Sequence, residues 1–147
     1  MSKSQLVEDG VDVTSPVDVL EVTVVTPEAT VLKSPAQFVA LPLYDGEIGI
    51  APGRAPLIGR LGFGEMRLKE GGKTLRYYID GGFVEVSKNF VTVLTSRAIP
   101  ADKIDAAVVA ERLAAAQQKP ANTPELLEIR DRAIAAARGQ LWVARRK

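Results

Sequence analysis

The side chains of this chain that could do chemistry are carboxylates, lysines and arginines, because its 147 residues include no histidine and no cysteine. Without histidine it lacks the usual general base, the usual metal-ligating imidazole and the side chain that titrates near neutral pH. Without cysteine it has neither disulfides nor thiolate metal sites. A carboxylate enzyme remains open, but two acids would have to converge in a pocket, and the sequence offers no paired-acid motif. The composition therefore favours a non-catalytic role.

Other common binding chemistries are also not indicated. Gly71-Gly72 lacks the following Lys-Ser/Thr of a phosphate-binding loop. A net charge of +1 argues against general nucleic-acid binding. No apolar run is long enough to cross a membrane, so no direct membrane insertion is expected. Residues 1–18 resemble neither a secretory signal nor a transit peptide, which predicts a cytoplasmic chain with a loosely held N-terminal extension.

The stretch Gly46–Gly64 combines six glycines and two prolines with persistent apolar residues. Glycine and proline fix backbone shape, and the apolar side chains need a surface to pack on. The combination predicts a rigid surface loop that docks on a partner. Two charged residues stand out in it, Glu47 and Arg54. The simpler interpretation of each is a solvated side chain in a turn.

Two regions follow from the change in composition near Pro100, a β domain over residues 19–99 and a helical segment over 100–147. In the first, alternation predicts strands at Val19–Val25 and Phe38–Leu43. A hairpin is expected around Gly71-Gly72, then a turn at Asp80-Gly81-Gly82, then a second hairpin from Phe83 to Leu94. Phe83 is interpreted as core. Many short strands at this spacing suggest a sandwich or flattened barrel.

The helical segment predicts two antiparallel helices. Asp102 is expected to cap the first, which runs to about Gln118, and Thr123 caps the second ahead of Pro124. The facing residues are mostly alanines, which bury little area, so the pair could be either a moving arm or a stable hairpin. The second helix ends in Arg138, Arg145, Arg146 and Lys147. These cations either complement the helix C-terminus or dock on an acidic surface.

Three motifs in order resemble a known family, the epsilon subunit of the F-type ATP synthase. They are G-E-I-G-I followed by P-G-R-A-P-L, then G-G-F-V-E-V with Asn89, then the alanine-rich helical pair. The likeness spans residues 19–147. It implies a flattened sandwich of about ten strands followed by a helix–loop–helix arm.

The resemblance also implies a non-catalytic role in the central stalk, on the cytoplasmic face of a bacterial inner membrane. Such a subunit couples gamma to the membrane rotor ring of c subunits, and its arm can inhibit ATP hydrolysis by the alpha and beta subunits. Glu47 matches a glutamate that faces the ring. The gamma-facing motif is matched by Pro52, Gly53, Arg54, Ala55, Pro56 and Leu57. Arg138, Arg145 and Arg146 match in character the basic residues that meet an acidic segment of beta.

Two departures from the family matter. Arg54 stands where histidine is usual, so the docking surface is expected to remain, but any pH response of that histidine is lost. Some members bind ATP through I/L-D-x-x-R-A; here Ile104-Asp105 is present, but Val108-Val109 replaces Arg-Ala. Nucleotide binding there is therefore not expected, and no cofactor is implied. The alternative is a free-standing adaptor that binds unrelated proteins.

Overall fold

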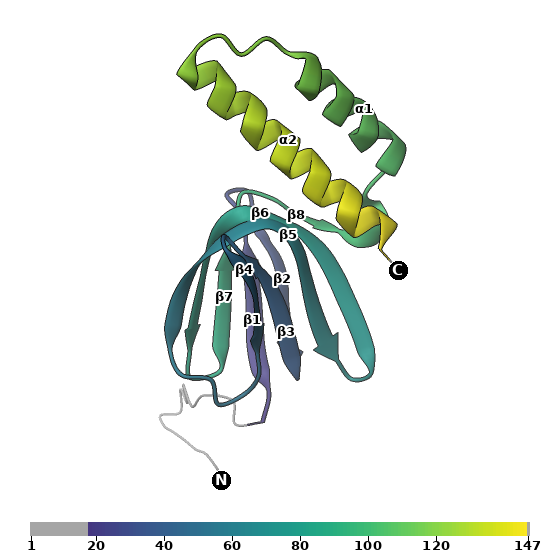
Figure 1. Ribbon diagram of the computed structural model, residues 1–147. Helices are drawn as coiled ribbons and strands as arrows, with labels where there is room; N and C mark the ends of the chain where they lie inside the picture. The colour runs from purple at the N-terminus through teal and green to yellow at the C-terminus, as the bar shows by residue number, and fades with distance from the viewer. Residues whose placement is uncertain (1–17, 147) are drawn as a thin grey trace.

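Residues 18–146 are described in the computed structural model, which has eight strands followed by helices (Figure 1). The elements are β1 (Leu20–Val25), β2 (Thr30–Ala36), β3 (Phe38–Leu43), β4 (Gly46–Ile50), β5 (Leu57–Glu70), β6 (Lys73–Ser87), β7 (Phe90–Leu94), β8 (Ala98–Pro100), the 3₁₀ helix η1 (Ala101–Lys103), α1 (Ala106–Gln118) and α2 (Pro124–Arg145). A β sandwich followed by a helical hairpin is confirmed, with eight strands in the described part rather than about ten. The expected extension lies outside the described residues, except for Asp18.

The strands form one continuous sheet in the order β2-β1-β7-β6-β5-β3-β4, and β8 pairs with β6. Only β1 and β7 run parallel; the other neighbours are antiparallel. β5 and β6 are much longer than the rest and fold over, which closes the sheet into a sandwich (Figure 1). The expected hairpin at Gly71-Gly72 joins them. The second expected hairpin joins β6 to β7 through Lys88 and Asn89, both at positive φ.

One apolar core fills the sandwich, because alternate residues of each strand point inward. It is built from aliphatic side chains, among them Leu20, Val39, Met66, Ile79 and Val84. A smaller apolar cluster lies between α1 and α2 around Val109, Ala137 and Leu141. The two clusters share no member. The helical hairpin therefore carries its own small core.

The turn expected at Asp80-Gly81-Gly82 is not a turn, since β6 runs through it without interruption. Gly81 and Gly82 have φ of 73° and 108°, values that side chains disfavour. They bend β6 and change which residues face inward: Ile79 before the bend, Val84 after it. Phe83 consequently faces outward and is 56% exposed, so its assignment to the core was wrong.

The stretch Gly46–Gly64 is likewise not a single loop. It contains β4, a short connection over residues 51–56, and the first half of β5. The strand geometry explains the apolar residues within it, because Ile50 and Leu61 are core. Its glycines allow close packing; a Cβ on Gly62 would lie 2.8 Å from the carbonyl oxygen of Leu43.

The helical hairpin lies across the bend of β5 and β6 (Figure 1). Thr123 caps α2 ahead of Pro124, as expected. The cap of α1 is Asp105 rather than Asp102, because residues 101–103 form η1 first; the Asp105 carboxylate accepts hydrogen bonds from the amides of Ala107 and Val108. The alanine seam is only partly used: Ala114 is exposed, whereas Val109 is buried.

Candidate partner-docking surfaces

The connection between β4 and β5 presents most of the sequence-predicted gamma motif to solvent. Arg54, Ala55 and Pro56 are exposed, and Pro52 is half-buried. The loop is fixed at Gly53, whose amide donates to the side-chain oxygen of Asn89 at 2.8 Å. Because Asn89 belongs to the β6–β7 turn, this bond ties the loop to that end of the sandwich. A loop held in this way offers a preformed shape to a partner.

Leu57 differs from the rest of that motif. It begins β5 and packs half-buried against the sandwich core. The next residue, Ile58, points the other way and is 77% exposed. The outward-facing apolar residue at this end of β5 is therefore Ile58, while Leu57 supports the fold.

Ile58 belongs to an outward-facing surface, rich in large apolar side chains, that we call the outer patch. It crosses β5, β6 and β7 and continues to the β3–β4 turn, and its exposed members are Tyr44, Ile58, Phe83, Phe90 and Leu94. Cross-strand pairing places Phe83 opposite Leu94 and also opposite Arg60. The Arg60 guanidinium lies over the Tyr44 ring at 4.3 Å. Exposed Glu85 lies opposite Ile58 on the same face. The outer patch thus mixes large apolar side chains with charged ones, as protein interfaces commonly do.

The opposite half of the β5–β6 hairpin faces α2. Its outward residues form what we call the arm-facing row: Phe63, Glu65 and Arg67 on β5, with Arg76, Tyr78 and Asp80 on β6. Gly139 of α2 comes closest, since a Cβ there would lie 3.0 Å from Cε1 of Tyr78 and 3.3 Å from the carbonyl oxygen of Phe63. The absence of a side chain on Gly139 is what lets the helix settle on the row.

Tyr78 lies fully buried beneath α2. Its hydroxyl donates to the Asp80 carboxylate at 2.7 Å and also hydrogen-bonds with the side chain of Gln140 on α2. Burial, followed by the hydrogen bond to Asp80, raises the pKa of Tyr78 well above its usual range. This hydroxyl therefore stays neutral and supports the docked helix through a polar contact.

Glu65 is the centre of the charged part of the row. Its side chain is 1% exposed, yet it is fully paired. Oε1 accepts from Nη1 of Arg67 at 3.1 Å and from Nη1 of Arg146 at 2.9 Å, while Oε2 accepts from Nε of Arg76 at 2.5 Å. A carboxylate out of water needs such partners. Arg146, beyond the end of α2, is one of them.

The remaining predicted residues gather near this cluster. Glu47 follows the β3–β4 turn and pairs with Arg67 at 3.2 Å, with its side chain 53% exposed. Glu47 and Arg138 line the same shallow cleft between β4 and α2, next to Trp142. Arg145 is exposed at the end of α2. The structure thus separates the candidate residues into two groups. One is the connection over residues 52–56 with Leu57 at the start of β5. The other is Glu47 on β4 with Arg138, Arg145 and Arg146 on the arm.

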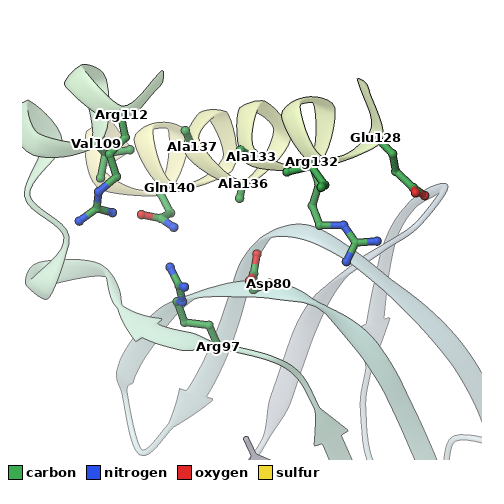
Figure 2. A pocket seen from close by; sticks show the side chains of 11 residues that line it. Asp80, Arg97, Val109, Arg112, Glu128, Arg132, Ala133, Ala136, Ala137 and Gln140 are labelled. Carbon is green, nitrogen blue, oxygen red and sulfur yellow. The ribbon is translucent and has the colours of Figure 1, made fainter. Parts of the chain in front are cut away.

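A cavity of about 540 Å³ lies between the helical hairpin and the sheet, and its α2 lining runs from Glu128 to Gln140. Figure 2 shows Arg97 and Asp80 on the sheet side, with Arg112, Arg132 and Gln140 on the helices. Neither Ile104 nor Asp105 lines it: Ile104 packs on the apolar cluster of the helices, and Asp105 is the helix cap.

Residues 18–146 hold no group of three or more acidic side chains placed to bind a metal ion. No helix among them is long and apolar enough to span a bilayer.

The β domain matches the family model for the ATP synthase delta/epsilon chain, beta-sandwich domain, over residues 19–101. The ATP synthase epsilon chain of Rhodopirellula baltica is 51% identical over 122 residues, which cover 83% of this chain and 95% of that one. The chain belongs to the ATP synthase epsilon family. The epsilon chain of Desulfitobacterium hafniense strain Y51 is 50% identical over 82 residues, 56% of this chain and 62% of that one. The resemblance inferred from the three motifs is confirmed, and the epsilon chain is a non-catalytic subunit.

Solved structures support the fold of this epsilon-family chain at lower identity. A chain in the Euglena gracilis mitochondrial ATP synthase, from an assembly of OSCP, F1 and c-ring, has a TM-score of 0.76 and 23% identity, covering 90% of this chain and 86% of that one. A chain in the central stalk and c-ring of the Tetrahymena thermophila mitochondrial enzyme has a TM-score of 0.61 and 14% identity, covering 85% and 96%.

Sequence reasoning missed the outer patch and Glu65 of this epsilon-family chain. A signal for the patch was present in the alternation of Phe83-Val84-Glu85-Val86, which places Phe83 on the same face as Glu85. No signal pointed to Glu65. Its partners Arg76 and Arg146 are 11 and 81 residues away and meet it only in the folded chain.

Proposed function

We propose that this chain is a central-stalk rotor subunit of a proton-translocating ATP synthase and that it docks on the gamma subunit through its outer patch. The observation that carries this proposal is the patch itself, five exposed apolar or aromatic side chains on neighbouring strands and the adjoining turn. Family membership supplies the partner, because related chains occur in central-stalk and c-ring assemblies. The exposed Arg54 loop lies next to the patch, so both belong to one continuous docking surface.

The other contacts follow from the same assignment. Glu47 beside the β3–β4 turn would face the polar loops of the rotor ring, and the chain would sit as a peripheral protein on the cytoplasmic face of a bacterial inner membrane. The helical hairpin would be an arm that inhibits ATP hydrolysis when it leaves the sandwich and meets the alpha and beta subunits. Its apolar cluster, which shares no member with the sandwich core, supports an arm that moves as a unit.

Binding to gamma tests the first part. Ile58→Asp should weaken the complex by roughly 10- to 100-fold, because burying an isoleucine is worth about 1.5–3 kcal/mol and each 1.4 kcal/mol is tenfold in affinity. Val31→Asp is the matched control, since Val31 is also an exposed apolar residue but lies on the edge strand β2. Calorimetry that gives equal affinities for the two variants would refute the placement of gamma on the outer patch, and failure of the unmodified chain to bind gamma would favour the free-standing adaptor.

Hydrolysis by the alpha–beta–gamma complex tests the second part. The full chain should slow ATP hydrolysis more than a chain that ends at Pro100. A cysteine in place of Glu47 should form a disulfide with a cysteine in the ring's polar loop, while one at Val31 should not. Equal hydrolysis rates with the full and the shortened chain would refute the inhibitory role. Equal crosslinking from positions 47 and 31 would refute the contact of Glu47 with the ring.

A further inference from the structure

Several of the contacts between arm and sandwich are polar. Arg146 reaches Glu65, Arg76 donates from Nη2 to the carbonyl oxygen of Val143 at 2.8 Å, and Gln140 reaches Tyr78. The apolar clusters of the two parts do not join. Charged and polar contacts that cross an interface respond to salt, whereas aliphatic packing is much less sensitive.

From these contacts we infer that Glu65, with Arg67 and Arg76, forms an electrostatic latch that receives Arg146 and the C-terminal end of α2 and sets the balance between docked and released arm. Arg76 contributes in two ways: it pairs with Glu65, and it donates a hydrogen bond to the carbonyl oxygen of Val143 in the last turn of α2. Carbonyls at a helix C-terminus have no partner within the helix, and a cation there is favourable.

The latch is built to open without leaving a buried charge behind. If Arg146 leaves, Glu65 keeps Arg67 and Arg76 from its own hairpin. Water can then reach the carboxylate, because α2 is what covers it. On the arm, Arg146 is already 41% exposed and stacks over Trp142 at 4.8 Å, so it too remains solvated. Breaking a fully buried pair would be far more unfavourable.

The arrangement also explains how the arm is oriented. The contacts of the arm with the sandwich through Gly139, Gln140 and Val143 come from the C-terminal half of α2, and Arg146 follows directly after it. The proposed latch therefore acts on the end of α2 that makes these contacts.

The test measures docking in the isolated full chain. Since the chain has no cysteine, dyes can be placed on cysteines introduced at Lys33 in β2 and Asn122 between the helices, both exposed. Single-molecule energy transfer then reports the docked fraction. Arg146→Gln should lower the docked-to-released ratio about 3- to 10-fold, as for a partly exposed ion pair. Raising salt from about 0.1 M to about 1 M should lower the ratio of the unmodified chain in the same direction.

Arg145→Gln is the matched control, because Arg145 is the exposed neighbour and has no ion pair within residues 18–146. In a Glu65→Gln background, Arg146→Gln should have little further effect. Three results would each overturn the latch. The first is that Arg145→Gln lowers the docked-to-released ratio as much as Arg146→Gln does. The second is that Arg146→Gln has its full effect in the Glu65→Gln background, and the third is that neither salt nor Arg146→Gln changes the docked fraction.

Any effect of the latch on ATP hydrolysis depends on the proposed inhibitory role of the arm. The latch itself, which concerns only docking of the arm on the sandwich, does not depend on that role. Arg146→Gln should favour the released arm in the isolated chain whatever the arm then does. If docking shifts but hydrolysis by the alpha–beta–gamma complex is unaffected by the arm, the latch stands and the inhibitory role fails. If Arg146→Gln does not change the docked fraction, the latch is refuted. The inhibitory role of the arm is then still tested by comparing hydrolysis with the full chain and with the chain that ends at Pro100.

Discussion

Replacing Gly139 with leucine should drive the arm off the sandwich. A Cβ at this position would lie 3.0 Å from Cε1 of Tyr78 and 3.3 Å from the backbone oxygen of Phe63. Neither neighbour can yield, because Tyr78 is fully buried and the oxygen belongs to strand β5. Overpacking of this kind costs about 1–3 kcal/mol. The better helix propensity of leucine, roughly 0.8 kcal/mol, stabilises docked and released helices equally and does not offset the clash.

A penalty of about 1–3 kcal/mol corresponds to about a 5- to 150-fold fall in the docked-to-released ratio. The same dye pair at Lys33 and Asn122 would measure it, with circular dichroism to confirm that the helices persist. Ala114→Leu, at an exposed position on α1, adds bulk away from the interface and should leave the ratio unchanged. A Gly139→Leu chain that docks as well as the unmodified one would show that α2 does not rest on this part of the row.

Three further outcomes concern stability. Gly82→Ala should destabilise the sandwich by about 3 kcal/mol or more in urea, because φ is 108° and a methyl group would overlap a carbonyl oxygen of β7. Gly72→Ala is the control, because Gly72 also has positive φ but a methyl group there would meet no neighbouring atom; it should cost only about 1–2 kcal/mol. Equal losses of stability in the two variants would refute the clash at Gly82. Asp105→Ala should lower arm stability by about 1 kcal/mol in thermal melts, while Asp102→Ala should not; the reverse result would restore Asp102 as the cap. Folding raises the pKa of Tyr78. The contribution of Tyr78 to the free energy of unfolding is therefore complete below about pH 10 and declines above that pH, by up to about 1.4 kcal/mol per pH unit. In urea titrations, Tyr78→Phe should reduce the loss of unfolding free energy with rising pH above about pH 10. An unchanged pH dependence would contradict the role of the Tyr78 hydroxyl.

The sequence predicted the fold class because the alternation in β1 and β3 and the cap at Thr123 are local signals. Three strands, β2, β4 and β8, were missed. β2 contains Pro35 and is an edge strand, where proline is tolerated but weakens the sequence signal. β8 is only three residues long. β4 was hidden by its glycines, which were interpreted as a loop.

The glycines near position 81 illustrate why a strong local signal was misinterpreted. A turn was expected at Gly81-Gly82, but a bend in a strand and a turn can use the same positive φ values. Which of them occurs is decided by pairing with β5, a long-range contact that no local pattern reports. The error then propagated to Phe83, because inward and outward positions exchange across the bend.

The same bend gives the β5–β6 hairpin two separate working surfaces. Before it on β6 lie Arg76 and Tyr78, which receive the arm; after it lies Phe83 of the outer patch, proposed to receive gamma. The two groups occupy different halves of one rigid pair of strands, so neither partner has to vacate its surface for the other. The arm could therefore dock and release while the chain stays on gamma. Coupling between the two events would then have to pass through the bend at Gly81-Gly82 or through contacts that gamma itself makes with the arm.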